Sequence, residues 1–465
     1  LEELRAERGG QPIALIMGMD AFAGLGGWHR AQELIGLAHM VVAVRPGELR
    51  SLVWSFAYFF CLLAGYYVLR PLRDEMGVAG GVRNLQWLFT ATFLAMLAAV
   101  PLYGALVARL PRRRFIPVVY HFFAANIAIF WLLLTFDVER LTVARVFFVW
   151  ISVFNLFAVS VFWSFMADLF SSEQGKRLFA VIAAGGTAGA LAGPALTIWL
   201  AVPLGPANLL ILAALFLEAA VLCVKRLESV SIESEKQSRR KPESEALGGG
   251  WLAGVALLLR SPYLAGIALW VTLLSVTGTF LYFQQANIVA AASDDPAVRT
   301  RMFASIDLAV GLLTVAVQFF ATGKLIERFG IGAAVAFLPL VFAGGFAVLA
   351  AAPALAVVVG FQALQRTANF AISNPAREVL FTVLAREEKY KAKNVIDIVV
   401  FRGADAAGGW LFAALRSLGM ELRAISLVAI PLAAAWLVVA LALGRAHESR
   451  AAQVAGSPGK GDAHG

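Results

Sequence analysis

Charged residues are scarce in this chain. Asp, Glu, Lys and Arg make up 15% of its 465 residues, whereas hydrophobic residues make up 60%. A soluble domain carries roughly 25% charged residues, so this chain has too little charge to cover a surface that faces water. The composition therefore excludes an ordinary soluble protein and predicts a surface that faces lipid.

Cysteine and histidine are also rare. The two cysteines, Cys61 and Cys223, both lie in apolar runs, and the five histidines are scattered. These residues offer no disulfide framework, no zinc-ligand spacing and no His-Glu-x-x-His pair. The sequence shows no constellation of nucleophile, base and metal ligands either. We therefore expect no metal, no cofactor and no enzymatic activity.

The formal net charge of +9 does not indicate nucleic-acid binding. No basic stripe with interleaved aromatic residues lies outside the apolar runs, which is the pattern that such binding requires. In a membrane protein, an excess of Lys and Arg is typical of loops on the cytoplasmic side. We expect a lipid bilayer and a small-molecule substrate as partners, and a functional monomer.

Residues 1–50 differ from the rest of the chain. Glu, Arg and Gly interrupt this segment too often for it to span a membrane, and no cleavable signal peptide is evident. We expect an amphipathic surface helix, a disordered segment, or residues that precede the true start. We assign it no function.

Twelve apolar runs follow, and each is long enough to cross a bilayer, which needs about 20 residues. A polar stretch over residues 225–250 divides them into six and six, and residues 445–465 form a polar tail. We predict an all-α membrane protein with a six-helix bundle over residues 51–224, a cytoplasmic linker, a second bundle over 251–444 and a disordered tail. The twelve runs are 52–70, 85–107, 115–136, 143–170, 178–200, 203–224, 264–291, 302–322, 332–351, 355–384, 393–415 and 425–443.

Basic residues predict the orientation of these spans. They recur in alternate loops, whereas the remaining loops are short and uncharged or carry both signs. Since Lys and Arg concentrate in cytoplasmic loops, both termini should lie inside the cell, in the inner membrane. The residues concerned are Arg109, Arg112, Arg113, Arg114, Lys176, Arg177, Lys324, Arg328, Lys389, Lys391 and Lys393.

The two halves of the chain also resemble each other. Residues 104–109 read Gly-Ala-Leu-Val-Ala-Arg after the second span, and residues 323–328 read Gly-Lys-Leu-Ile-Glu-Arg after the eighth. Duplicated halves are typical of secondary transporters. This loop with its following basic residues resembles the short loop motif of the major facilitator superfamily. The resemblance implies a transporter with two pseudo-symmetric bundles.

Polar residues inside the tenth span form one stripe. Gln362, Arg366, Asn369, Ser373 and Arg377 recur every three or four residues and so share a helix face. Ionisable groups inside a span cost about 2.5–3.5 kcal/mol each unless they meet a partner or water. We expect Gln362, Arg366, Asn369 and Arg377 to bind substrate. Hydrogen bonding between helices is an alternative that suits the amides and the serine better than it suits Arg366.

Two further spans carry candidate binding residues. In the first span Tyr66, Arg70 and Arg73 share a face if the helix continues past Pro71, although both arginines could extend to the membrane surface instead. In the seventh span Thr279 and Tyr282 continue a row of hydroxyl groups, and such groups also serve packing between membrane helices.

Carboxylates inside the spans are candidates for coupling or gating. Arg402 and Asp405 are three residues apart, so a local ion pair is their plain interpretation. Asp307 and Asp397 are possible proton-binding groups, and so is Asp168, although it lies close to a helix end. Glycines at 185, 186, 189 and 193 imitate a phosphate loop, but no strand precedes them and no Gly-Lys-Ser/Thr follows, so we expect close helix packing there.

Several segments resemble the bacterial and plastid ATP/ADP translocases, a group of nucleotide exchange transporters. The matching residues are Leu-Arg-Pro-Leu-Arg-Asp-Glu at 69–75, Phe-Trp-Ser-Phe-Met-Ala-Asp at 162–168, Glu-Gln-Gly-Lys-Arg-Leu-Phe at 173–179 and the run 378–403 followed by two glycines. The resemblance implies exchange of nucleotides. The chain departs from that family at three places. Met76 follows Glu75 where the family's Arg-Asp-x-Lys-Asp run has its lysine, and Asp168 replaces an amide. The lysine that is usual after Arg-x-Gly is absent, and Ala404 and Asp405 follow Gly403 instead.

The sequence is compatible with three functions. The first is exchange of nucleotides or of another phosphorylated or anionic metabolite by alternating access. In that mechanism an empty cavity would hold unpaired arginines, and it would close readily only around a bound anion. The second is a proton-coupled importer or exporter of the same fold that uses Asp307 or Asp397. The third is a membrane sensor or assembly protein that transports nothing.

Overall fold

The protein is described here by a computed structural model. It describes residues 14–17, 39–42, 45, 47–109, 112–235, 257–258, 260–320, 322–384 and 386–456. Nearly all of these residues are helical, which confirms the predicted all-α class.

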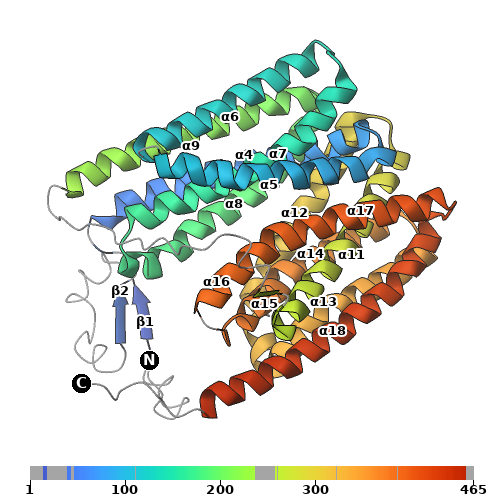
Figure 1. Cartoon of the computed structure of the whole chain (residues 1–465). Helices are drawn as coiled ribbons and strands as arrows, with labels where there is room; N and C mark the ends of the chain where they lie inside the picture. Colours follow the sequence, from blue (N-terminus) through green and yellow to red (C-terminus); the bar gives the residue numbers. More distant parts are fainter. Residues whose placement is uncertain are drawn as a thin grey trace, which may run out of the picture.

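The helices form two bundles that lie against each other (Figure 1). The N-terminal bundle consists of α4 (Glu48–Ala79), the short η2 (Val82–Asn84), α5 (Leu85–Arg109), α6 (Arg112–Thr135), α7 (Arg140–Leu169), α8 (Ser172–Leu204) and α9 (Pro206–Glu235). The C-terminal bundle consists of α11 (Pro262–Ala292), α12 (Pro296–Phe320), α13 (Thr322–Ala351), α14 (Leu355–Ala368), the π-helical turn η3 (Asn369–Ser373), α15 (Asn374–Leu380), α16 (Arg386–Val395), the π-helical turn η4 (Ile396–Val400), α17 (Phe401–Ser417) and α18 (Leu422–Gly456).

Eleven helices in the described part of the chain are long and apolar enough to span a membrane. The predicted tenth span is not among them. It is divided into α14, η3 and α15, which follow one another without a gap from Leu355 to Leu380. This segment therefore completes the six helices of the second bundle. Its polar stripe lowers its mean hydropathy, which explains why it is not among the eleven apolar helices.

Several boundaries differ from the predicted ones. Helix α4 continues past Pro71 to Ala79, α9 extends to Glu235 and α18 extends to Gly456, so parts of the expected linker and tail are helical. The described parts of the first segment are two short strands, β1 (Ala14–Met17) and β2 (His39–Val42), which pair in parallel. At those residues neither an amphipathic helix nor disorder is present. The rest of the predicted linker and tail lies outside the described residues.

Each bundle buries its own apolar core. One cluster gathers aromatic residues of α4, α6 and α7, such as Tyr58, Phe147 and Phe162, and the other gathers Trp270, Phe342 and Trp436 of the C-terminal bundle. The second cluster also includes Val78 and Leu85 from the N-terminal bundle. The two bundles are therefore joined by apolar contact where α4 ends and α5 begins.

The start of α8 shows how sequence fixes one end of the N-terminal bundle. Ser171 and Gln174 form a capping box, in which each side chain accepts a hydrogen bond from the other residue's backbone amide. Gln174 and Arg177 then donate to Glu48 at the start of α4, with the Arg177 Nη2 to Glu48 Oε1 distance at 2.8 Å. The Glu-Gln-Gly-Lys-Arg motif thus ties α8 to α4.

The glycine row of α8 lies against the backbone of α4. A Cβ atom at Gly185 would stand 2.5 Å from the carbonyl oxygen of Phe56, and one at Gly193 would stand 2.7 Å from that of Ala64. Since no side chain fits between the two backbones, these glycines serve close packing, as the sequence predicted.

We expect Gly193→Ala to destabilise the protein by about 1–3 kcal/mol, because the new methyl group must push α4 and α8 apart. Gly344→Ala in α13 is the matched control, since no atom lies within 4 Å of its added Cβ. Melting temperatures measured in detergent should fall for the first variant and not for the second. Equal melting temperatures would contradict the packing assignment.

Candidate functional site

The tenth span changes its helix type within its polar stripe. The sequence predicted a kink at Asn374-Pro375, whereas the helix widens into the π-helical turn η3 just before that pair. Pro375 has no N–H to donate to the carbonyl of Ala371, and a wider turn accommodates this loss. Arg366 lies one turn before η3, at the end of α14.

Arg366 is held by a carboxylate of the neighbouring helix α12. Its Nη1 lies 2.6 Å from Oδ1 of Asp307, and Nη1 of Arg70 on α4 lies 3.5 Å from the same oxygen. Asp307 is only 3% exposed, and its Oδ2 is buried without a hydrogen-bond partner. The site therefore joins both bundles through one carboxylate and two guanidinium groups.

This arrangement corrects the expectation that the arginines of an empty cavity are unpaired. The sequence predicts a proton-binding or gating role for Asp307 but not its pairing with these arginines, because the periodicity of one helix does not show which side chain of another helix faces it. Arg70 and Arg366 share a single carboxylate, so one positive charge remains without a counter-charge from Asp307.

A cavity of about 340 Å³ adjoins this cluster. Its wall comes from α4 and α8 of one bundle and from α12, α14 and η3 of the other. Asp307 and Arg366 line it together with the aromatic residues Phe59, Tyr67 and Phe370. The cavity thus offers both charge and flat apolar surface at the interface between the bundles.

A second cavity of about 240 Å³ lies between α4, α5 and α7 of the first bundle and α11 and α17 of the second. Its two arginines are each paired. Nη1 of Arg402 lies 3.3 Å from Asp405, which also accepts a 2.5 Å hydrogen bond from Ser275, and Nη2 of Arg73 lies 2.6 Å from Asp74. Tyr282 donates to Asp74 across the bundle interface at 3.0 Å. Thr279 also lines this cavity.

An ion pair joins the bundles near the end of α4. Glu75 accepts two hydrogen bonds of 2.7 Å from Nε and Nη2 of Arg299, near the start of α12. Glu75 is 1% exposed and Arg299 is 9% exposed. Trp410 of α17 donates to Thr90 of α5 at 3.0 Å and contacts Trp87, so a second interhelical contact joins the bundles. The bundles are thus held together at the end of α4 that lies away from the marked termini (Figure 1).

Other predicted site residues lie apart from both cavities. Arg377 pairs with Asp397 at 3.2 Å, beside the Lys393–Glu378 pair, so these groups link α15 to the segment from α16 to η4. Gln362 is buried in a chain of amides, in which it donates to Gln285 and accepts from Gln365. Neither residue lines a cavity described above.

Three more predicted residues have other surroundings. Tyr66 is half-buried and contacts Tyr67 edge to face. The Oδ1 atom of Asn369 is buried without a partner, and Asp168 is exposed at the end of α7.

Sequence reasoning missed the aromatic wall and the pair that joins the bundles. Phe59, Tyr67 and Phe370 lie in apolar runs whose pattern does not distinguish them from residues that face lipid. Glu75 and Arg299 each lie next to a charged loop, so their burial follows only from the contact between α4 and α12.

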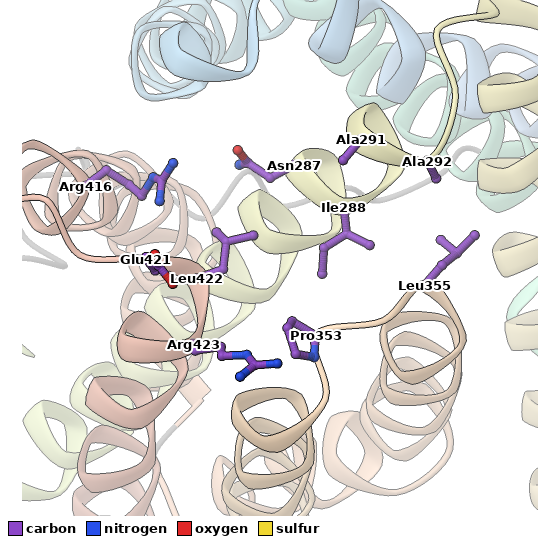
Figure 2. Close-up of a pocket in the computed structure, with 10 residues that line it drawn as sticks. All are labelled: Asn287, Ile288, Ala291, Ala292, Pro353, Leu355, Arg416, Glu421, Leu422 and Arg423. Atoms are coloured by element: carbon purple, nitrogen blue, oxygen red, sulfur yellow. The ribbon is translucent and has the colours of Figure 1, made fainter.

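A larger hollow, of about 500 Å³, lies wholly in the C-terminal bundle (Figure 2). It is lined by residues of α11, of the start of α14 and the segment before it, of the end of α17 and the segment after it, and of α18, and they include Arg416, Glu421 and Arg423. All three of these side chains are exposed, and Arg416 donates to the carbonyl of Met420. Because this hollow does not lie between the bundles, we do not place the candidate site there. Among the described residues, no three His, Cys, Asp or Glu side chains gather as a metal site.

Comparison with solved structures identifies the same fold in several transporters. An auto-inhibited peptide transporter of the POT family has a TM-score of 0.59 with 15% sequence identity, over 86% of this chain and 97% of that one. An inward-facing, unoccupied bacterial homologue of the human lysosomal transporter Spinster has a TM-score of 0.56 with 13% identity, over 90% and 100% of the two chains. The nucleoside transporter NupG has a TM-score of 0.55 with 14% identity, over 87% and 99%. At these identities the likeness shows the fold alone.

Curated relatives match only short segments. A probable nicotinate-nucleotide adenylyltransferase of Cellvibrio japonicus is 56% identical over 48 residues, which are 10% of this chain and 23% of that protein. Another from Dechloromonas aromatica is 47% identical over 106 residues, which are 21% of this chain and 44% of that protein. The chain thus spans less than half the length of these relatives.

The profile of the Major Facilitator Superfamily, by contrast, matches residues 52–391. That range runs from α4 of the first bundle to α16 of the second, and so includes both sides of the cavity at Arg366. The chain is therefore a multi-pass membrane protein that belongs to the major facilitator superfamily.

Proposed function

We propose that this protein exchanges a small phosphorylated or otherwise anionic metabolite across the inner membrane by alternating access. The observation that carries the proposal is the convergence of Arg366 and Arg70, from opposite bundles, on Asp307, which lines a cavity at the interface together with Arg366. Guanidinium groups bind phosphate and carboxylate through two parallel hydrogen bonds. A solute held between them contacts both bundles, and movement of one bundle against the other then changes its exposure.

Nucleotides are one candidate class of solute. Phe59, Tyr67 and Phe370 line the cavity beside the charged cluster, and flat aromatic side chains stack on bases. The resemblance of the segments at 69–75 and 378–403 to ATP/ADP translocases supports this choice, and NupG, which shares the fold, is a nucleoside transporter. The protein would act as a monomer, because each bundle supplies one wall of the cavity.

Proton-coupled transport is the second candidate function. The observation in its favour is Asp307, a buried carboxylate that lines the cavity and lies between two arginines. Binding of a proton to Asp307 would release both guanidinium groups. A membrane sensor that transports nothing is the third candidate, and it would not need charged residues at this cavity.

Counterflow in vesicles made with purified protein tests the proposal. Labelled nucleotides, sugar phosphates and inorganic phosphate are offered outside vesicles loaded with the unlabelled solute. We expect at least one of these anions to accumulate without a proton gradient. Accumulation of only neutral or cationic solutes would contradict the anion proposal, and dependence on a proton gradient would favour the second function.

Cysteine labelling tests the proposed orientation. After Cys61 and Cys223 are replaced, we expect a single cysteine at position 238, in the predicted linker, to react with an impermeant reagent only from the cytoplasmic side. The linker carries mixed charges between two bundles of six helices, so it should lie on the same side as both termini. Labelling of position 238 from outside intact cells would overturn the orientation.

A further inference from the structure

The charges at the bundle interface do not balance. Four arginines belong to the cluster. Arg366 lines the first cavity, and Arg73 and Arg402 line the second. Arg70 pairs with Asp307, which lines the first cavity. Three carboxylates face them, namely Asp74, Asp307 and Asp405. The cluster therefore carries one net positive charge.

The surplus charge lies beside the first cavity, which Asp307 and Arg366 line. In the second cavity each arginine has its own carboxylate, and hydroxyl groups of Ser275 and Tyr282 also donate to those carboxylates. Beside the first cavity, Arg70 and Arg366 share Asp307. Of these two cavities, the first is therefore the one where an added anion finds an uncompensated positive charge.

We propose that Asp307 determines the charge of the solute, so that the site accepts one net negative charge and rejects two or more. This inference rests on the proposed function, and it narrows the substrate class to carboxylates, phosphodiesters and singly ionised phosphates. A monoanion neutralises the cluster while Asp307 stays paired with Arg70 and Arg366. The second charge of a dianion has no partner in the cavity and is repelled by Asp307, and this repulsion is strong in a poorly solvated interior. Nucleoside diphosphates and triphosphates are then excluded.

Two ions of like shape separate charge from size. Perrhenate and tungstate are both tetrahedral oxyanions, the first with one negative charge and the second with two. We expect the purified wild-type protein to bind perrhenate more tightly than tungstate in calorimetric titrations. In Asp307→Asn the ratio of the two affinities should move toward tungstate by about tenfold or more, which corresponds to about 1.4 kcal/mol. Since the comparison is between proteins, differences in hydration of the two ions cancel.

Asp137→Asn is the matched control, because it removes one carboxylate in an exposed turn whose partner Arg140 lies 3.8 Å away. That variant should keep the wild-type ratio. A wild-type preference for tungstate, or a ratio that Asp307→Asn leaves unchanged, would overturn the inference and leave the anion site standing. Failure of both ions to bind the wild-type protein would count against the inference and the proposed function together.

If Asp307→Asn does not fold, a measurement on the wild-type protein still tests whether the site prefers one negative charge to two or more. Cyclic AMP, AMP and ADP carry about one, two and three negative charges at neutral pH on the same nucleoside. Displacement of bound perrhenate should be strongest with cyclic AMP and should weaken with each further charge. Stronger displacement by ADP than by cyclic AMP would overturn the inference.

Discussion

Replacing Arg366 by glutamine should weaken binding of the anionic solute by roughly ten- to a hundredfold, since hydrogen bonds to charged groups contribute about 1.5–3 kcal/mol. The variant leaves Asp307 with only the longer contact to Arg70, at 3.5 Å, and removes the net positive charge of the cluster. An incoming anion would then meet a neutral cluster, in which Arg70 balances Asp307 and no surplus positive charge remains. The measurement is the half-saturating solute concentration for counterflow in vesicles, at fixed pH and without a proton gradient.

Two variants accompany this test. Arg366→Lys should restore binding only in part, because an ammonium group cannot form two parallel hydrogen bonds with an oxyanion. Arg140→Gln removes an exposed arginine that lines neither cavity and should leave the affinity unchanged. Residual exchange in Arg366→Gln should also depend less on solute at the opposite side. If both the affinity and this dependence equal those of the wild type, Arg366 is not part of the site.

Glu75→Gln should weaken the contact between the bundles by about 3–5 kcal/mol, the usual cost of removing one partner of a buried ion pair. Arg299, a residue that is 9% exposed, would keep the hydrogen bond of 3.1 Å from its Nη1 to the carbonyl of Ser293. Since Glu75 and Arg299 belong to different bundles, the loss favours separation of the bundles at this end. We expect a lower melting temperature and faster labelling of a cysteine introduced at Thr279, measured with impermeant reagent on each side of the membrane.

An exposed pair within one bundle provides the control for Glu75. Glu218 lies 2.9 Å from Nδ1 of His121, and both side chains are exposed, so Glu218→Gln should change stability little. The double variant Glu75→Arg with Arg299→Glu should recover part of the lost stability, because the ion pair reforms in reverse. If Glu75→Gln melts and labels like Glu218→Gln, the pair does not hold the bundles together.

Much of the fold was accessible from the sequence because a bilayer imposes simple requirements. Each span must satisfy its backbone hydrogen bonds internally, so apolar length alone located most helices. The helix ends differ from the predicted ones where a helix continues through polar residues, as α9 does to Glu235, since an apolar run ends before such a helix does. The π-helical turn after Arg366 was also missed, because Pro375 indicates a break in the hydrogen bonding but not how the backbone responds.

The site was predictable only one helix at a time. The polar stripe of the tenth span singled out Arg366, which lines the cavity between the bundles, and it also included Arg377, which pairs with Asp397 elsewhere. Both arginines have the same spacing on the helix. What distinguishes them is the carboxylate that each meets on another segment, and that depends on tertiary contacts that helical periodicity does not contain.

The position of a bound anion would show directly whether the cavity lined by Asp307 and Arg366 is the anion-binding site. Crystals of the protein grown with perrhenate would reveal the rhenium atom through its anomalous scattering. We expect a peak in the cavity lined by Asp307 and Arg366, with an oxygen of the ion within hydrogen-bond distance of the Arg366 guanidinium. A peak confined to the hollow at Arg416 and Arg423, with none beside Arg366, would contradict it.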